Sequence, residues 1–93
     1  PHDLFDAALG ACTAMTVLMV ARRRKVPLEQ IEVEVVRDAS EERAGHYRLR
    51  REITMTGPLT EAERAGLLEI ADKCPIHRLM QHPVEITTVL APA

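Results

Sequence analysis

The sequence predicts an α+β domain in which helices cover one face of a mainly antiparallel sheet. One long apolar helical segment comes first, and alternating strand patterns and shorter helices follow it. At 93 residues the chain is one domain's worth of protein, and a body of this size leaves a large share of its surface in water. We therefore expect a single domain over residues 1–93 that a second subunit stabilises.

The first expected element is a helix from Asp3 to about Lys25. Its residues are strong helix formers, apolar on nearly every face until Arg22, and Pro27 ends the helix. Polar residues interrupt the apolar run and four consecutive cations follow it, which favours a core helix over a membrane span. A helix that is apolar all round must be surrounded, either in the core or at a subunit interface.

Two segments after this helix alternate apolar and polar residues with period two, which is typical of strands with one buried face. They are Ile31–Val35 and Tyr47–Met55. The polar stretch from Asp38 to Gly45 lies between them. The pattern predicts a hairpin with a long exposed loop.

The second half of the chain predicts two further helices and a strand. Thr60 and Glu63 form a capping-box pattern at the start of the first helix, which we expect to end near Lys73. This helix should turn four apolar side chains toward the core: Leu67, Leu68, Ile70 and Ala71. Pro75 suits the first position of a short helix, which places Cys74 at its N-cap. Val84–Leu90 alternates again and predicts a third strand.

Composition excludes several classes of partner. Apolar residues make up 46% of the chain, but with no Trp, one Tyr and one Phe the core must be aliphatic, which excludes stacking platforms for nucleic acids. The net charge of −2 gives no electrostatic reason to expect DNA, RNA or an anionic membrane as partner. Two basic clusters, residues 22–25 and Arg48 with Arg50 and Arg51, are interpreted as solvated faces.

The two cysteines carry the chemistry that the sequence suggests. Without a signal-peptide pattern we expect a reducing cytoplasm, where a thiol pair is more often catalytic, redox-active or inert than a structural bridge. A thiol is nucleophilic as thiolate, and its pKa falls near a cation or a helix N-terminus. Cys74 has the helix N-terminus. Cys12 lies about three turns into its own helix and needs a cation from elsewhere in the fold.

Other interpretations of these cysteines stay open from the residues alone. Cys12 also suits the role of a small buried hydrophobic residue. Cys74 and His77 have the spacing of half a metal site, but neither the other cysteine nor the remaining histidines supply a second paired motif, so we expect no metal. A structural disulfide is a further alternative. The other three histidines, in terminal or loop-like segments, are interpreted as non-functional: His2, His46 and His82.

Two motifs identify a family resemblance. Residues 8–16, Ala-Leu-Gly-Ala-Cys-Thr-Ala-Met-Thr, and residues 71–78, Ala-Asp-Lys-Cys-Pro-Ile-His-Arg, closely resemble the OsmC/Ohr family of osmotically induced and organic-hydroperoxide-resistance proteins. The resemblance covers nearly the whole chain. It implies an OsmC-like fold in which two chains intertwine around long buried central helices as a homodimer. It also implies an antioxidant thiol peroxidase, without cofactor, that reduces organic hydroperoxides or hydrogen peroxide.

The resemblance also assigns roles to the thiols. By position, Cys12 resembles the peroxidatic cysteine, which the peroxide converts to a sulfenic acid, and Cys74 resembles the resolving cysteine, which forms a disulfide that an external dithiol reduces. An apolar wall that includes Leu4 is expected to favour alkyl peroxides. The expected supporting and pocket residues are Asp3, Phe5, Leu9, Met15 and His77.

The N-terminal end departs from the family pattern. In the family, an arginine from an N-terminal β-region activates the peroxidatic thiolate, and a glutamate about ten residues before the first cysteine binds that arginine. This sequence begins where that region ends, and His2 occupies the glutamate position with Asp3 beside it. The leading hypothesis is a cytoplasmic two-cysteine peroxidase of the oxidative stress response. The alternative is a shortened module that binds a small apolar or oxidised ligand at a dimer interface, without turnover.

Overall fold

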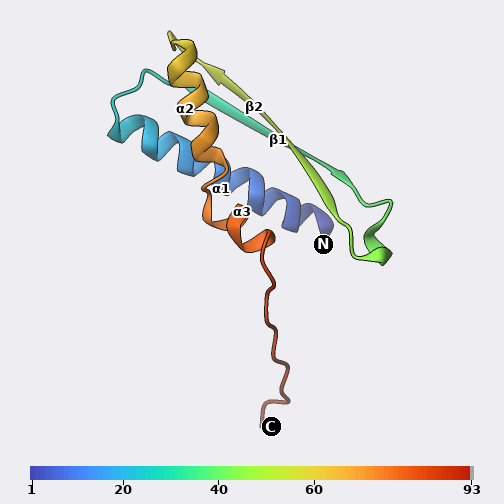
Figure 1. Cartoon of the computed structure of the whole chain (residues 1–93). Coiled ribbons are helices and arrows are strands. Elements are labelled where there is room, and N and C mark those ends of the chain that lie inside the picture. The colour runs from blue at the N-terminus through green and yellow to red at the C-terminus, as the bar shows by residue number, and fades with distance from the viewer. Residues whose placement is uncertain (93) are drawn as a thin grey trace.

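The computed structural model describes residues 1–92 and confirms the predicted α+β class. In chain order the elements are α1 (His2–Arg23), β1 (Gln30–Asp38), the 3-10 turn η1 (Glu42–Ala44), β2 (Arg48–Thr56), α2 (Glu61–Ala71) and α3 (Pro75–Met80). β1 and β2 form a two-stranded sheet, α1 packs against β1, and α2 and α3 pack against α1 (Figure 1). The long first helix therefore packs against β1, α2 and α3.

The predicted hairpin is confirmed. The strands pair antiparallel from Gln30 opposite Thr56 to Asp38 opposite Arg48, and η1 lies in the loop that joins them. Gly45 ends η1 with a φ of 87°, a left-handed conformation that glycine adopts without steric cost. Because side chains alternate across a strand, one face of the hairpin is half-buried against the helices and the other is exposed.

The hydrophobic core lies between α1 and α2. Its buried members are Val17, Val20, Ala21, Leu67, Ile70 and Ala71, with Val26, Leu28, Ile31, Ile53 and Met55 packed around them. Three of the four predicted core residues of α2 are therefore confirmed. The prediction for Leu68 is wrong, because Leu67, Ile70 and Ala71 share one helix face at spacings of three and four residues, whereas Leu68 lies off that face and is exposed.

Both predicted helix starts in the second half are confirmed. The Glu63 amide donates to Thr60 Oγ1 at 3.1 Å, and the Thr60 amide donates to Glu63 Oε1 at 2.9 Å, which completes the capping box of α2. Pro75 occupies the first turn of α3, and Cys74 is its N-cap. These local signals depend on few residues, and the structure reproduces them at the positions that the sequence indicated.

α1 differs from the predicted helix in how far it is surrounded. By length and composition it could cross a membrane, with a mean hydropathy of 1.8 over its most apolar window. In this fold one face of α1 is buried against the other elements of the domain, and this face includes two polar residues, Asp6 and Thr13. The opposite face leaves Leu4, Met15 and Met19 exposed, so a single chain does not bury the helix on all sides.

The prediction of a third strand at Val84–Leu90 is wrong. The segment forms no strand, and its large apolar side chains are exposed. Figure 1 shows the chain after α3 running away from the body of the domain. A strand exists through hydrogen bonds to a neighbouring strand, and this segment reaches neither β1 nor β2.

Candidate functional site

The packing of α3 against α1 brings the two cysteines within hydrogen-bonding reach of each other. Cys12 lies in the middle of α1 and is partly exposed, whereas Cys74, at the start of α3, is 0% exposed. Both are free thiols. Two residues that are far apart in the sequence therefore form one thiol site, with Cys12 on its solvent side.

Hydrogen bonds make the Cys12 thiol more acidic than an ordinary cysteine. Partial burial raises its pKa, but the Cys74 side chain, the Ile76 backbone N–H and the Thr16 hydroxyl lower it by more, so that the net shift is downward. The Thr16 Oγ1 atom lies 3.9 Å from Cys12 Sγ. The Ile76 N–H belongs to the first turn of α3, where backbone amides have no partner within the helix. The start of α3 thus stabilises the Cys12 thiolate.

This arrangement differs from the expectation that a cation activates Cys12. Within residues 1–92, the groups that lower its pKa are a thiol, a backbone amide and a hydroxyl. Pro75 correctly indicates a helix start, but from the sequence only Cys74 is expected to gain from the amides of that turn. Only the packing of α3 on α1 shows that an amide of this turn acts on Cys12.

Arg51 is a site residue that the sequence interpretation missed. It was grouped with Arg48 and Arg50 as a solvated face, but its side chain is only 11% exposed, so that interpretation is wrong for Arg51. Its Nη1 donates to Thr13 Oγ1 at 3.0 Å, and its Nη2 donates to Asp72 Oδ1 at 2.7 Å. A signal was present, because residues 49, 51 and 53 alternate onto the strand face that packs on the helices.

Three of the expected pocket residues line one cavity of about 630 Å³ beside the thiol site. Phe5 and Leu9 contribute from α1 and His77 from α3. The remaining lining residues are Gly45, Tyr47, Leu49, Arg51, Ile53, Leu68, Asp72, Met80 and Gln81. Neither cysteine is among these residues. Leu4 and Met15 lie on the exposed face of α1, so the structure does not place them with Phe5 and Leu9.

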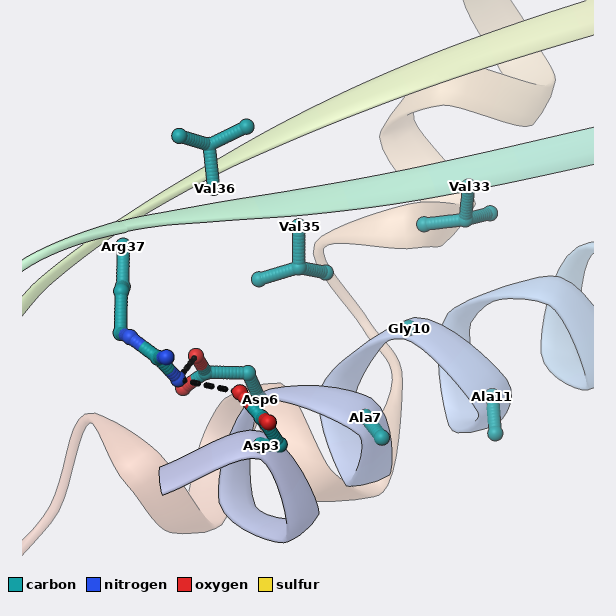
Figure 2. Close-up of a pocket in the computed structure, with 9 residues that line it drawn as sticks. All are labelled: Asp3, Asp6, Ala7, Gly10, Ala11, Val33, Val35, Val36 and Arg37. Atoms are coloured by element: carbon teal, nitrogen blue, oxygen red, sulfur yellow. Dashed lines mark hydrogen bonds and ion pairs between the residues drawn. The ribbon is translucent and has the colours of Figure 1, made fainter.

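Asp3 lies at another place, near the start of α1. Its carboxylate accepts a hydrogen bond of 2.7 Å from Arg37 of β1, and the hydrogen bond and charge of Arg37 lower the pKa of Asp3. Arg37 also donates to the buried carboxylate of Asp6 at 2.9 Å. Figure 2 shows both carboxylates turned toward this guanidinium at one end of a groove of about 600 Å³ between α1 and β1. Asp3 does bind an arginine, but this arginine does not act on Cys12.

The residues that the structure describes contain no group of three or more His, Cys, Asp or Glu side chains that could bind a metal ion. His2 and His46 each pair with a glutamate of the hairpin loop, Glu42 and Glu41 respectively.

A family model described as OsmC-like protein matches residues 1–89 of the sequence. The chain belongs to the OsmC family. No curated protein matches it in sequence. The match covers α1, the hairpin, α2 and α3, so both cysteines lie within the family region.

Solved OsmC structures share the fold. An OsmC-like protein from Mycoplasma pneumoniae superposes with a TM-score of 0.72 at 20% identity, over 87% of this chain and 61% of that chain. A Legionella pneumophila protein superposes with a TM-score of 0.67 at 28% identity, over 87% of this chain and 61% of that chain. That protein is described as an organic hydroperoxide resistance protein and predicted redox protein. This chain therefore spans about three fifths of the length of its structural relatives.

Proposed function

We propose that this OsmC-family chain is a thiol-dependent peroxidase that reduces organic hydroperoxides or hydrogen peroxide, with Cys12 as peroxidatic and Cys74 as resolving cysteine. The observation that carries the proposal is the pairing of a partly exposed Cys12 thiol, whose pKa is lowered, with a second free thiol beside it. A redox cysteine of this kind is typically acidic, accessible and close to a resolving cysteine. The peroxide-resistance description of the Legionella relative supports the same substrate class.

The first chemical step consumes the peroxide. The Cys12 thiolate attacks one peroxide oxygen, so that a sulfur–oxygen bond forms and the oxygen–oxygen bond breaks. The leaving alkoxide, or hydroxide from hydrogen peroxide, takes up a proton and departs as alcohol or water. Cys12 is then a sulfenic acid. The Ile76 amide and the Thr16 hydroxyl, which stabilise the thiolate, supply the reactive form for this step.

The second step forms a disulfide, and the third restores the thiols. The Cys74 sulfur attacks the sulfenic sulfur of Cys12, the sulfur–sulfur bond forms, and the hydroxyl leaves with the Cys74 proton as water. An external dithiol then reduces the disulfide and is itself oxidised to a disulfide. Because Cys74 is buried and Cys12 is partly exposed, the reductant attacks the Cys12 sulfur.

Peroxide consumption tests the proposal directly. Cumene hydroperoxide loss is measured with dithiothreitol as reductant for the native chain, Cys12→Ser and Cys74→Ser. We expect Cys12→Ser to abolish turnover. We expect Cys74→Ser, treated with peroxide before dithiothreitol is added, to stop at a Cys12 sulfenic acid, which dimedone labels. Thr16→Ser, which keeps the hydroxyl beside Cys12, is the matched control and should remain active. Equal background rates in all four proteins would refute the peroxidase function.

The cavity beside the site favours a second candidate function. It is lined by apolar side chains, among them Phe5, Leu9 and Met80, and by polar ones, among them His77 and Arg51, but it does not include Cys12. A module that binds a small apolar or oxidised ligand, without turnover, would use this cavity or an interface close to it. Equilibrium dialysis with cumyl alcohol tests this function. Saturable binding to a chain without peroxidase activity would favour it over the first proposal.

Two further properties belong to the proposal. The chain acts as a homodimer, because one chain leaves the outer face of α1 and the segment after α3 without apolar partners. It works in the cytoplasm, where reduced dithiols are available and free cysteines persist.

A further inference from the structure

Arg51 differs from its neighbours on β2 in being buried. Arg50 is 79% exposed and pairs with Glu52, two residues away on the outer face of the same strand. The Arg51 side chain points to the opposite face, toward the helices, and is 11% exposed. Burial of a guanidinium costs free energy unless its N–H donors are hydrogen-bonded. The hydrogen-bond partners of Arg51 therefore indicate its role.

The guanidinium of Arg51 connects two segments of the fold. One end donates to the hydroxyl of the fully buried Thr13 at 3.0 Å. That hydroxyl donates its own proton to the Leu9 carbonyl at 2.7 Å, so it accepts from Arg51 in a fixed direction. The other end of the guanidinium donates to Asp72 at 2.7 Å. Since the guanidinium is planar and rigid, these two bonds fix the distance between Thr13 and Asp72.

The two partners of Arg51 are close neighbours of the two cysteines. Thr13 follows Cys12 on α1, and Asp72 is the C-cap of α2, two residues before Cys74. Between Asp72 and Cys74 the chain turns from α2 into α3. Arg51 therefore joins the helix that carries Cys12 to the turn that carries Cys74. It is not among the groups that shift the pKa of Cys12.

We propose that Arg51 is a positioning residue that sets Cys74 against Cys12 and so governs formation of the disulfide. The role rests on the proposed function, which it deepens by assigning a residue to the second chemical step. In that step the Cys74 sulfur must meet the Cys12 sulfenic sulfur while water leaves. Attack of the Cys12 thiolate on peroxide does not require the two sulfur atoms to come into contact, and it depends on Cys74 and Ile76 only through the pKa of Cys12. Loss of the Arg51 contacts therefore slows disulfide formation far more than sulfenic acid formation.

The other end of this contact provides a variant that keeps the fold. Asp72 is 71% exposed, and an ion pair with an exposed partner contributes little to stability. Asp72→Ala removes the contact with Arg51 at the turn and leaves the Arg51 bond to Thr13 in place. Lys73→Ala is the matched control, because Lys73 is an exposed residue of the same turn. On β2, Arg51→Met removes both bonds, Arg51→Lys keeps the charge, and Arg50→Met is the control.

The first measurement is the equilibrium between the dithiol and disulfide forms of the chain in glutathione buffers. The two forms are distinguished by alkylating the free thiols and measuring the mass of the chain. In this exchange, glutathione disulfide oxidises the two thiols and is reduced to two glutathione molecules. We expect Asp72→Ala and Arg51→Met to lower the effective concentration of the two thiols for each other by about tenfold to a hundredfold. Arg51→Lys should recover part of the loss, and both controls should match the native chain. An unchanged value in both Asp72→Ala and Arg51→Met would overturn the role of Arg51.

The second measurement separates the two chemical steps. After one equivalent of cumene hydroperoxide, dimedone labelling of Cys12 should rise in Asp72→Ala, because the sulfenic acid lasts longer, while peroxide is consumed at close to the native rate in the first turnover. A slowed first turnover with no rise in labelling would contradict a positioning role. If the native chain forms no sulfenic acid, the proposed function fails, and the glutathione equilibrium still decides the role of Arg51.

Discussion

The Arg37 guanidinium lies 2.9 Å from the buried carboxylate of Asp6. The same carboxylate accepts a hydrogen bond of 2.7 Å from the Tyr47 hydroxyl through its other oxygen. Asp6 lies in α1 and Arg37 lies near the end of β1. Tyr47 is the residue that directly precedes β2. One buried carboxylate therefore connects the start of α1 to both arms of the hairpin. One of its oxygens accepts from the Arg37 guanidinium, and the other accepts from the Tyr47 hydroxyl.

Asp6→Asn should destabilise the chain by about 1–3 kcal/mol. An amide offers one acceptor oxygen, so its NH2 group would face either the Arg37 guanidinium or the Tyr47 hydroxyl. Asp3→Asn is the matched control, since the exposed Asp3 pairs with the same arginine and should change stability little. The free energy of unfolding in urea measures the difference. Equal losses in the two variants would show that burial of Asp6 does not matter.

Alkylation of Cys12 should follow a pH profile shifted toward acid. The hydrogen bonds from Cys74, Ile76 and Thr16 outweigh partial burial and place the pKa of Cys12 below its ordinary value. Iodoacetamide should therefore react with a midpoint at lower pH in the folded chain than in the same chain unfolded in urea. Thr16→Val should shift the midpoint back toward the ordinary value, and Thr16→Ser should not. One midpoint for all four samples would contradict this account.

The same pKa shift has a consequence for stability. Between the folded and the unfolded pKa of Cys12, the unfolded chain binds more protons, so the free energy of unfolding rises with pH. The contribution is fully present above the unfolded pKa and is lost as the pH falls through the folded pKa. Urea unfolding across this window should show the rise for the native chain and a smaller one for Cys12→Ser. Parallel curves for the two proteins would refute the linkage.

Patterns that depend on a few adjacent residues predicted most of the fold. The hairpin, the capping box at Thr60 and the N-cap position of Cys74 were each correct, because strand alternation and helix caps depend on residues that are close together in the sequence. The strand at Val84–Leu90 was wrong, because alternation shows that a segment could form a strand and not that an edge is available to it.

The site was predicted less completely, because its chemistry depends on contacts between distant segments. Family motifs suggested Cys12 and Cys74 as candidate site residues, but the Ile76 amide reaches Cys12 only through the packing of α3 on α1. Arg51 was missed because three nearby arginines suggested a solvated cluster, although its position on the strand placed it on the buried face. Strand alternation should have outweighed the local charge density at that position.

Thr60→Ala should destabilise the chain by about 0.5–2 kcal/mol, because it removes the hydroxyl that accepts the Glu63 amide at the start of α2. α2 supplies half of the buried core, so fraying at this end should be seen in global unfolding as well as in helix content. Thr60→Ser keeps the hydroxyl and is the matched control. Urea unfolding followed by circular dichroism compares the three proteins. Equal losses in the alanine and serine variants would rule out the hydroxyl as the cause.

A homodimer should form through the outer face of α1. Met15 and Met19 are each 65% exposed on one chain, and complete burial of such a side chain contributes about 1.5–3 kcal/mol. The double variant Met15→Lys with Met19→Lys would bury two charges at that interface and should convert the dimer to monomers in sedimentation velocity. Glu69→Lys, an exposed position on α2, is the control for a change of charge alone and should stay dimeric. A native chain that sediments as a monomer, or a double variant that stays dimeric, would exclude this face as the interface.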